Sequence, residues 1–373
     1  MPCRAMLVED IARRFNVPGR LAVLRPHGTG NVNDTYMVVF RTAFSEQRFI
    51  LQRIRKAIFP EPEIIMRNMR VITDHCHRKI EAGAESADRI WQLPKIIETL
   101  EGADFVTDAS GDLWRAITHI ASANSYEKVQ NLEHAREAGY VLGHFHRMIS
   151  DLPPERLAYA LPGFHVTPGY LAKMDAALVT PDGKARLAAS PEAQRCLRFI
   201  EQRRAFCHVL ENASIRGEIQ TRPIHGDPKV GNVMIDEDTG KGTCIVDLDT
   251  VQPGLIHYDV GDCMRSGCNP AGEETADLPS VVFDTDLFSA LYRGYLAMAG
   301  DFLTDAEKHY LFDSIHLIPL ELAIRFFGDY LAGDVYFKTR YPGHNLRRAL
   351  VQMRLTESIE ARESVIRKVM TSV

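Results

Sequence analysis

Apolar and polar positions in the first third of the chain follow a pattern typical of β-strands. Short apolar runs bounded by glycine or polar turn residues favour strands. A segment with apolar side chains at helical spacing, residues 58–80, separates two groups of such runs. The runs are residues 21–26, 36–40, 48–54, 91–97, 102–108 and 113–120. The order of strands, helix and strands predicts a β-rich region.

From about residue 124 the spacing of apolar residues becomes helical. Residues 132–149 have apolar side chains three and four positions apart, and Pro153 and Pro154 end this helix. Two further helices are expected around a turn at Pro181–Gly183, and the chain is mainly helical after Pro270. One hairpin, formed by residues 233–247, interrupts the helices. The pattern predicts an α+β protein that divides near residue 122.

Composition narrows the class of protein. The 373 residues carry a net charge of -5, which argues against nucleic acid as a partner because phosphate binding needs a clustered basic surface. No apolar run approaches the ~20 residues of a membrane span, and the N-terminus lacks a signal-peptide pattern. Seven cysteines without a CxxC pair are typical of reduced thiols. We expect a cytoplasmic protein without membrane partners, a monomer or weak dimer.

The stretch HGDPKVGNVMIDEDTGKGTCIVDLDT contains the strongest chemical signal. Asp227 and Asn232 lie in a loop, and Asp247 follows an apolar strand twenty residues later. In phosphoryl transfer one carboxylate orients the acceptor hydroxyl and takes its proton, while an amide oxygen and a second carboxylate hold Mg²⁺ against the phosphates of ATP. This order and spacing predict a kinase-like site. The alternative is that each carboxylate only caps a turn.

Two further features concern the nucleotide. Gly28, Gly30 and Asn31 belong to a loop, GTGN, whose backbone N–H groups could approach phosphates, although a plain hairpin turn explains the glycines equally well. Gln52 stands where a phosphate-binding lysine is expected on the third strand. A neutral amide cannot neutralise phosphate charge. Either another cation takes that role, or the protein does not bind ATP in the usual way.

Several stretches resemble the aminoglycoside phosphotransferase and choline kinase superfamily, most closely its N-acetylhexosamine 1-kinase branch, which also carries glutamine in place of the lysine. They extend over roughly residues 20–350. The stretches are HGTGNVNDTYMV, RFILQRIRKAIFPEPEIIMRNM, LGHFHRMI, HGDPKVGNVMID, IVDLDTVQPGLIHYDVGD and RFFGDYLAGDVYFKTRYPGHNL. The resemblance implies a two-lobed protein-kinase-like fold. Its small β-rich nucleotide-binding N-lobe would be residues 1–121, and its large, mainly helical catalytic and substrate-binding C-lobe residues 122–373.

The resemblance also implies ATP, Mg²⁺ and a sugar phosphorylated on its anomeric hydroxyl. The implied roles are Asp227 as base and substrate contact, Asn232 and Asp247 as metal ligands, Arg325, Tyr336 and Asn33 at the sugar, and the backbone from Thr118 to Ile120 at adenine.

Single residues keep alternative roles. Arg325 faces the substrate or pairs with a carboxylate such as Asp329, and Tyr336 binds sugar or packs in the core. Asp249 supports the metal or a turn, and Asp259 is expected to hydrogen-bond near His225.

Two other functions stay open at this point. One is a kinase for another hydroxyl compound, such as an aminoglycoside, choline or another amino alcohol, or another sugar. The other is a catalytically inactive kinase-like protein that binds nucleotide, which the glutamine at position 52 would favour.

Overall fold

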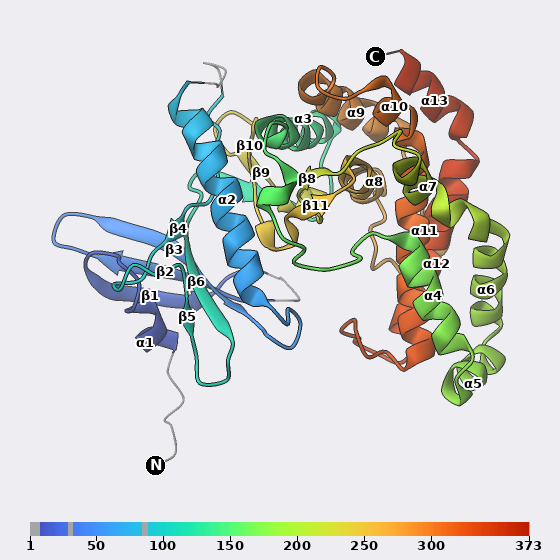
Figure 1. Ribbon diagram of the computed structural model, residues 1–373, viewed down its shortest axis with the longest axis horizontal. Coiled ribbons are helices and arrows are strands. Elements are labelled where there is room, and N and C mark those ends of the chain that lie inside the picture. Colours follow the sequence, from blue (N-terminus) through green and yellow to red (C-terminus); the bar gives the residue numbers. More distant parts are fainter. Residues whose placement is uncertain (1–7, 29–32, 84–88, 373) are drawn as a thin grey trace. The chain divides into compact units, whose positions relative to one another are not determined.

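The computed structural model describes residues 8–28, 33–83 and 89–372. The chain forms two compact units (Figure 1). Unit 1 consists of Met1–Ala123 with two short later segments, Glu155–Leu161 and Val246–Gln252. Unit 2 consists of Asn124–Pro154, Pro162–Ile245 and Pro253–Val373. The mixed α+β class expected from the sequence is confirmed, with a small antiparallel sheet region and a larger helical part.

Unit 1 is built on a six-stranded antiparallel sheet with the order β1-β2-β3-β6-β4, in which β5 also pairs with β6. Its strands are β1 (Arg20–Pro26), β2 (Asp34–Arg41), β3 (Glu46–Ile54), β4 (Ile96–Ile97), β5 (Val106–Thr107) and β6 (Leu113–Thr118). β4 is shorter than the predicted run 91–97 because Pro94 has no N–H to donate to a neighbouring strand.

Helices α1 (Val8–Ala12) and α2 (Pro62–Glu81) complete unit 1, together with the short 3₁₀ helix η4 (Leu248–Thr250). Asn68 of α2 is fully buried and explains why the two later segments belong to this unit. Its Nδ2 donates to the backbone oxygens of Ala158 (2.7 Å) and Val251 (2.8 Å). A buried amide that satisfies backbone groups from two segments holds both in place.

Unit 2 is mainly helical. Its helices are α3 (Leu132–Ile149), α4 (Thr167–Leu178), α5 (Pro181–Ala189), α6 (Pro191–Arg203), α7 (Val209–Ile215), α8 (Ile256–Gly267), α9 (Thr285–Ala299), α10 (Asp305–His309), α11 (Leu311–Ala332), α12 (His344–Glu360) and α13 (Glu363–Thr371). The short strands are β7 (Ala123–Ser125), β8 (Arg222–Ile224), β9 (Val233–Asp236), β10 (Gly242–Ile245) and β11 (Gln252–Gly254). The 3₁₀ helices of this unit are η2 (Arg204–His208), η3 (Val230–Asn232) and η5 (Leu278–Ser280), and η1 (Pro154–Arg156) lies where the chain passes from unit 2 to unit 1. Helices α4, α11 and α12 lie side by side, and α11 is the most apolar helix (Figure 1).

The predicted hairpin within residues 233–247 is confirmed, because β9 and β10 pair in antiparallel fashion. The turn predicted at Pro181–Gly183 is wrong, since these residues begin α5. Thr180 Oγ1 accepts the N–H of Gly183 as an N-cap, and proline suits the first helical turn because its φ is already helical.

Glycines allow α3 and α9 to pack backbone to backbone. A Cβ at Gly139 would lie 1.9 Å from the carbonyl oxygen of Leu291, and one at Gly294 would lie 2.0 Å from that of Arg136. Neither position admits a side chain without moving a helix. Among the described residues, no helix has the length and apolarity needed to span a bilayer. The six cysteines of the described part of the chain are buried and unbonded to one another.

His257 on α8 gives unit 2 a pH-dependent stability. The ring is fully buried, and its Nε2 donates to the backbone oxygen of Glu307 at 2.9 Å. Burial, aided by the charge of Arg222, lowers its pKa to about 4. As the pH falls, His257 therefore takes up a proton near pH 6.5 in the unfolded chain but only near pH 4 in the folded chain.

Above pH 6.5 we expect His257 to leave the free energy of unfolding unchanged. As the pH falls towards 4, it should lower that free energy by up to about 3 kcal/mol. His257→Gln should flatten that part of the stability curve in urea titrations between pH 4 and 7. His208→Gln, at an exposed position, serves as the control and should leave the curve unchanged. Parallel curves for wild type and His257→Gln would contradict the assignment.

Candidate active site

The loop that carries Asp227 is held by buried hydrogen bonds. It follows β8, and Gly226 has φ +88°, a conformation that favours glycine. The Asp259 carboxylate of α8 accepts the backbone N–H of His225 (2.6 Å) and of Gly226 (2.8 Å). Burial alone would raise the pKa of Asp259, but the hydrogen bond and charge of His146, 2.9 Å away, lower it. The predicted contact of Asp259 near His225 is confirmed.

Asp227 and Asn232 lie together in unit 2. Asn232 Nδ2 donates to the backbone oxygen of Asp227 at 2.7 Å and lies 3.4 Å from its Oδ2. Because the amide nitrogen is committed in this way, Oδ1 of Asn232 is the end of the amide available to a cation. Lys229 Nζ lies 2.9 Å from Asp227 Oδ2, and the Asp227 side chain is 31% exposed. The loop thus presents one carboxylate, one amide oxygen and one ammonium group.

Asp247 and Asp249 belong to unit 1 and have different surroundings. Asp247 is exposed and adopts a left-handed conformation, φ +67°, which aspartate tolerates better than most residues. Asp249 is buried in η4 and forms an ion pair with Arg115 of β6, which is only 1% exposed. Asn33 Nδ2 also donates to Asp249, at 2.6 Å. Asp249 therefore anchors the turn directly after Asp247.

Arg115 is a candidate site residue that the sequence did not single out. Gln52 and Arg115 are paired across β3 and β6, and Gln52 Oε1 accepts from Arg115 Nε (3.0 Å) and Nη2 (2.8 Å). The other end of Gln52 donates to Thr35 Oγ1 at 3.3 Å. Where a lysine was expected, the sheet therefore has Gln52 on β3 and the buried guanidinium of Arg115 on the adjacent strand β6. A cation inside the apolar run LWRAITHI was the available signal, because arginine is rarely buried without a partner.

The other residues expected at the nucleotide differ in their burial and in the hydrogen bonds that they form. Gly28 has φ +75°, whereas Gly30 and Asn31 lie outside the described residues. Thr118 uses its backbone N–H in a hydrogen bond to Lys95 O (2.9 Å), and Ile120 is buried. Within Asn33, Oδ1 is buried and has no hydrogen-bond partner among the described residues. Contacts of these residues with a nucleotide stay a prediction.

Arg325 of α11 sits among aromatic rings. Its guanidinium carbon lies 4.8 Å from the ring centre of Tyr170, 5.2 Å from that of Phe164 and 5.6 Å from that of Phe337. Its ion-pair partner is Glu321, one turn earlier, at 3.5 Å, and the side chain is 11% exposed. No hydrogen bond to another described residue uses its five donors. The Glu321 carboxylate thus offsets part of the Arg325 charge, and the N–H donors of Arg325 lie among aromatic rings without a protein acceptor in the described part of the chain.

The pairing of Arg325 with Asp329 that the sequence allowed is wrong. Asp329 instead accepts the backbone N–H groups of Val335, Tyr336 and Phe337. The chain reverses after α11 ends at Ala332, so these donors need an acceptor near the helix end. Tyr336 is 64% exposed, so its alternative role in the core is also wrong.

A chain of buried polar groups connects α11 to the Asp227 loop within unit 2. His165 Nε2 donates to the backbone oxygen of Gly226 (2.8 Å), and its Nδ1 bonds Glu321 Oε1 (3.0 Å). Burial opposes protonation of His165, but the charge of Glu321 and its hydrogen bond raise the pKa of the imidazole. Glu321 in turn pairs with Arg325. Arg325 is thereby linked through two side chains to the backbone beside Asp227.

More than half of the chain matches a known protein family. Residues 23–279 match the phosphotransferase enzyme family, and the chain belongs to that family. It is therefore a phosphotransferase. The family resemblance of the sequence is confirmed at this level, and its N-acetylhexosamine branch stays a prediction.

Three solved structures have the same overall fold. A microcompartment-associated aminopropanol kinase is 17% identical, with 96% of this chain and 97% of that chain covered and a TM-score of 0.59. An aminoglycoside phosphotransferase from Alicyclobacillus acidocaldarius is 13% identical, with 99% and 97% covered and a TM-score of 0.60. Spectinomycin phosphotransferase in complex with ADP and spectinomycin is 16% identical, with 96% and 100% covered and a TM-score of 0.55. At these identities the likeness concerns the fold alone.

Proposed function

We propose that this protein transfers the terminal phosphate of ATP to the anomeric hydroxyl of an N-acetylhexosamine. The observation that carries the proposal is the buried link from Arg325 through Glu321 and His165 to the Asp227 loop. This link supports the proposal because a candidate sugar-binding group and a candidate base share one framework of ion pairs and hydrogen bonds. Preorganised donors and bases are what phosphoryl transfer requires, because the protein contributes mainly position and charge.

Asp227 would orient the acceptor hydroxyl and accept its proton. Asp259 and His165 fix the backbone of the preceding Gly226, so the loop does not need to be ordered when substrate binds. Lys229 adds positive charge beside it, which suits an incoming phosphoryl group.

Mg²⁺ would be held by the Asn232 amide oxygen and the Asp247 carboxylate. These are hard oxygen ligands of the kind Mg²⁺ prefers, and the bound ion would offset negative charge on the phosphates. The ion pair of Arg115 with Asp249 would hold the turn that carries Asp247. Arg115 would also supply the positive field that Gln52 lacks, which weakens the case for an inactive kinase-like protein.

The surroundings of Arg325 favour a neutral sugar as acceptor. Its donors suit sugar hydroxyl and acetamido oxygens, and nearby aromatic side chains such as Tyr170 and Tyr336 offer ring faces and hydroxyl groups. A permanent guanidinium charge repels the ammonium groups of choline, amino alcohols and aminoglycosides. Those acceptors would need an acidic or cation-free aromatic site. The N-acetyl group and the anomeric position rest on the family resemblance.

The proposal is tested by ADP release with Mg-ATP and a panel of acceptors. The panel contains N-acetylglucosamine, N-acetylgalactosamine, glucose, galactose, choline, 1-amino-2-propanol and kanamycin. We expect turnover with an N-acetylhexosamine and a product that has lost its reducing end. Turnover with choline, aminopropanol or kanamycin alone would refute the sugar assignment while keeping the phosphotransferase. Binding of ATP without turnover of any acceptor would favour the inactive protein.

Arg325→Gln should raise the KM for the sugar at least ~10-fold, because charge-assisted hydrogen bonds are worth about 1.5–3 kcal/mol. The KM for ATP should change little. Arg204→Gln is the matched control, since Arg204 pairs with Asp175 and Glu201 at the surface. A KM for sugar that is equal in Arg325→Gln and Arg204→Gln would remove Arg325 from the acceptor site.

A further inference from the structure

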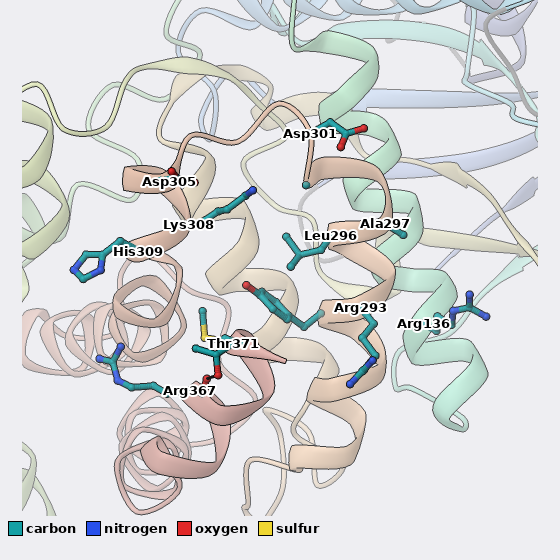
Figure 2. Close-up of a pocket in the computed structure, with 13 residues that line it drawn as sticks. Arg136, Arg293, Leu296, Ala297, Asp301, Asp305, Lys308, His309, Arg367 and Thr371 are labelled. Carbon is teal, nitrogen blue, oxygen red and sulfur yellow. Dashed lines mark hydrogen bonds between the residues drawn. The ribbon is translucent and has the colours of Figure 1, made fainter. Parts of the chain in front are cut away.

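A cavity in unit 2 contains none of the residues proposed for phosphoryl transfer. It has a volume of about 1020 Å³ and is formed by α9, α10 and α13, with one residue of α3 (Figure 2). Sites for small ligands are typically concave, with an apolar surface and a few polar groups. Leu296 and Met370 supply apolar lining here.

The lining carries more positive than negative charge. The lining contains four cationic side chains, Arg136, Arg293, Lys308 and Arg367, and two carboxylates, Asp301 and Asp305 (Figure 2). Arg367 Nε donates to Glu363 (2.7 Å), and Arg136 lies 3.8 Å from Glu133. Within the described part of the chain, Lys308 and Arg293 have no carboxylate partner. Two cations are therefore left to interact with solvent or a ligand.

Tyr292 adds a hydroxyl group to the lining of the cavity. It lines the cavity and is only 2% exposed, yet its hydroxyl forms no hydrogen bond with any described residue. The hydroxyl is thus free to donate to a molecule in the cavity. Burial also raises the pKa of Tyr292 to about 12, so the phenol keeps its proton and acts as a donor. A donor at a cavity wall with nearby cations suits an anionic acceptor oxygen.

We infer that this cavity binds an organic anion, a phosphate or carboxylate attached to an apolar group. Lys308 and Arg293 neutralise its charge, the Tyr292 hydroxyl donates to one of its oxygens, and Leu296 with Met370 contacts its apolar part. The inference is independent of the proposed kinase function, because it uses none of the same residues.

Isothermal titration of the full-length protein tests it with phenyl phosphate, benzoate, inorganic phosphate and benzyl alcohol. We expect one of the two aromatic anions to bind, and the better of them identifies the headgroup. Benzyl alcohol should not compete, and inorganic phosphate should bind more weakly than phenyl phosphate. Lys308→Ala should weaken binding about tenfold, the usual effect of losing one charge-assisted hydrogen bond. Lys368 is an exposed residue of α13 that does not line the cavity, so Lys368→Ala should not change binding.

Tyr292→Phe is the decisive variant, because it removes only the unpaired hydroxyl and keeps the packed ring. It should fold as wild type does and bind the aromatic anion several-fold more weakly. Absence of binding to the wild type would overturn the inference. So would binding that both Lys308→Ala and Tyr292→Phe leave unchanged, since the anion would then occupy another site. Equal affinity for benzyl alcohol would overturn the anionic character of the ligand.

Discussion

Asp227→Asn is expected to lower kcat for ADP formation by about 10²–10⁴-fold, the usual contribution of a positioned general base. Asparagine has nearly the same shape but cannot take the proton of the acceptor hydroxyl. The loop should keep its conformation, because its backbone is held by Asp259 and by His165 rather than by the Asp227 side chain. The affinity for ATP, measured by titration, should therefore stay within a few-fold of the wild type.

The matched control is Asp238→Asn, an exposed carboxylate on the turn between β9 and β10. It should retain full activity. If Asp227→Asn keeps more than about a tenth of the wild-type kcat, Asp227 is not the base. If both ATP affinity and kcat collapse, the substitution has disturbed the loop, and far-UV circular dichroism with a urea titration would reveal the damage.

Arg115→Met is expected to destabilise the protein by about 3–5 kcal/mol, because it leaves an uncompensated charge on buried Asp249. The Gln52 oxygen loses both of its donors in the same variant. This is a large share of the ~5–15 kcal/mol that holds a typical protein folded. Arg55→Met is the control, since Arg55 directly follows β3. Arg55 pairs with Asp34 at 2.7 Å, but the pair is over 30% exposed, and such pairs contribute about 0–1 kcal/mol.

The double variant Arg115→Met with Asp249→Leu separates stability from catalysis. Apolar replacement of both partners of a buried ion pair commonly restores stability. We expect the midpoint of urea unfolding to recover while kinase turnover stays low, because the turn after Asp247 has lost its anchor. Equal destabilisation by Arg115→Met and Arg55→Met would show that the buried pair does not stabilise unit 1. Full activity of the double variant would show that Asp249 does not position the metal ligand.

The sequence predicted most of the strands and helices because the spacing of apolar residues along the chain determines them. Short apolar runs between turn residues identified the strands of unit 1 and the hairpin of β9 and β10, and helical spacing identified α2 and α3. The turn at Pro181–Gly183 was misread because proline and glycine are common both in turns and at helix starts. The motif around Asp227 also showed its chemical class, since the spacing of carboxylates and amide is a local property.

Partners that are distant in the chain were decided by the tertiary structure alone. Arg115 and Asp249 are separated by 134 positions and His165 and Glu321 by 156, and no periodicity relates such pairs. Arg325 pairs backwards with Glu321 because the reversal after α11 brings three backbone donors to Asp329. The residue types and their spacing thus defined the phosphotransferase class. Burial and long-range contact, which give each charge its partner, defined which residues support the site.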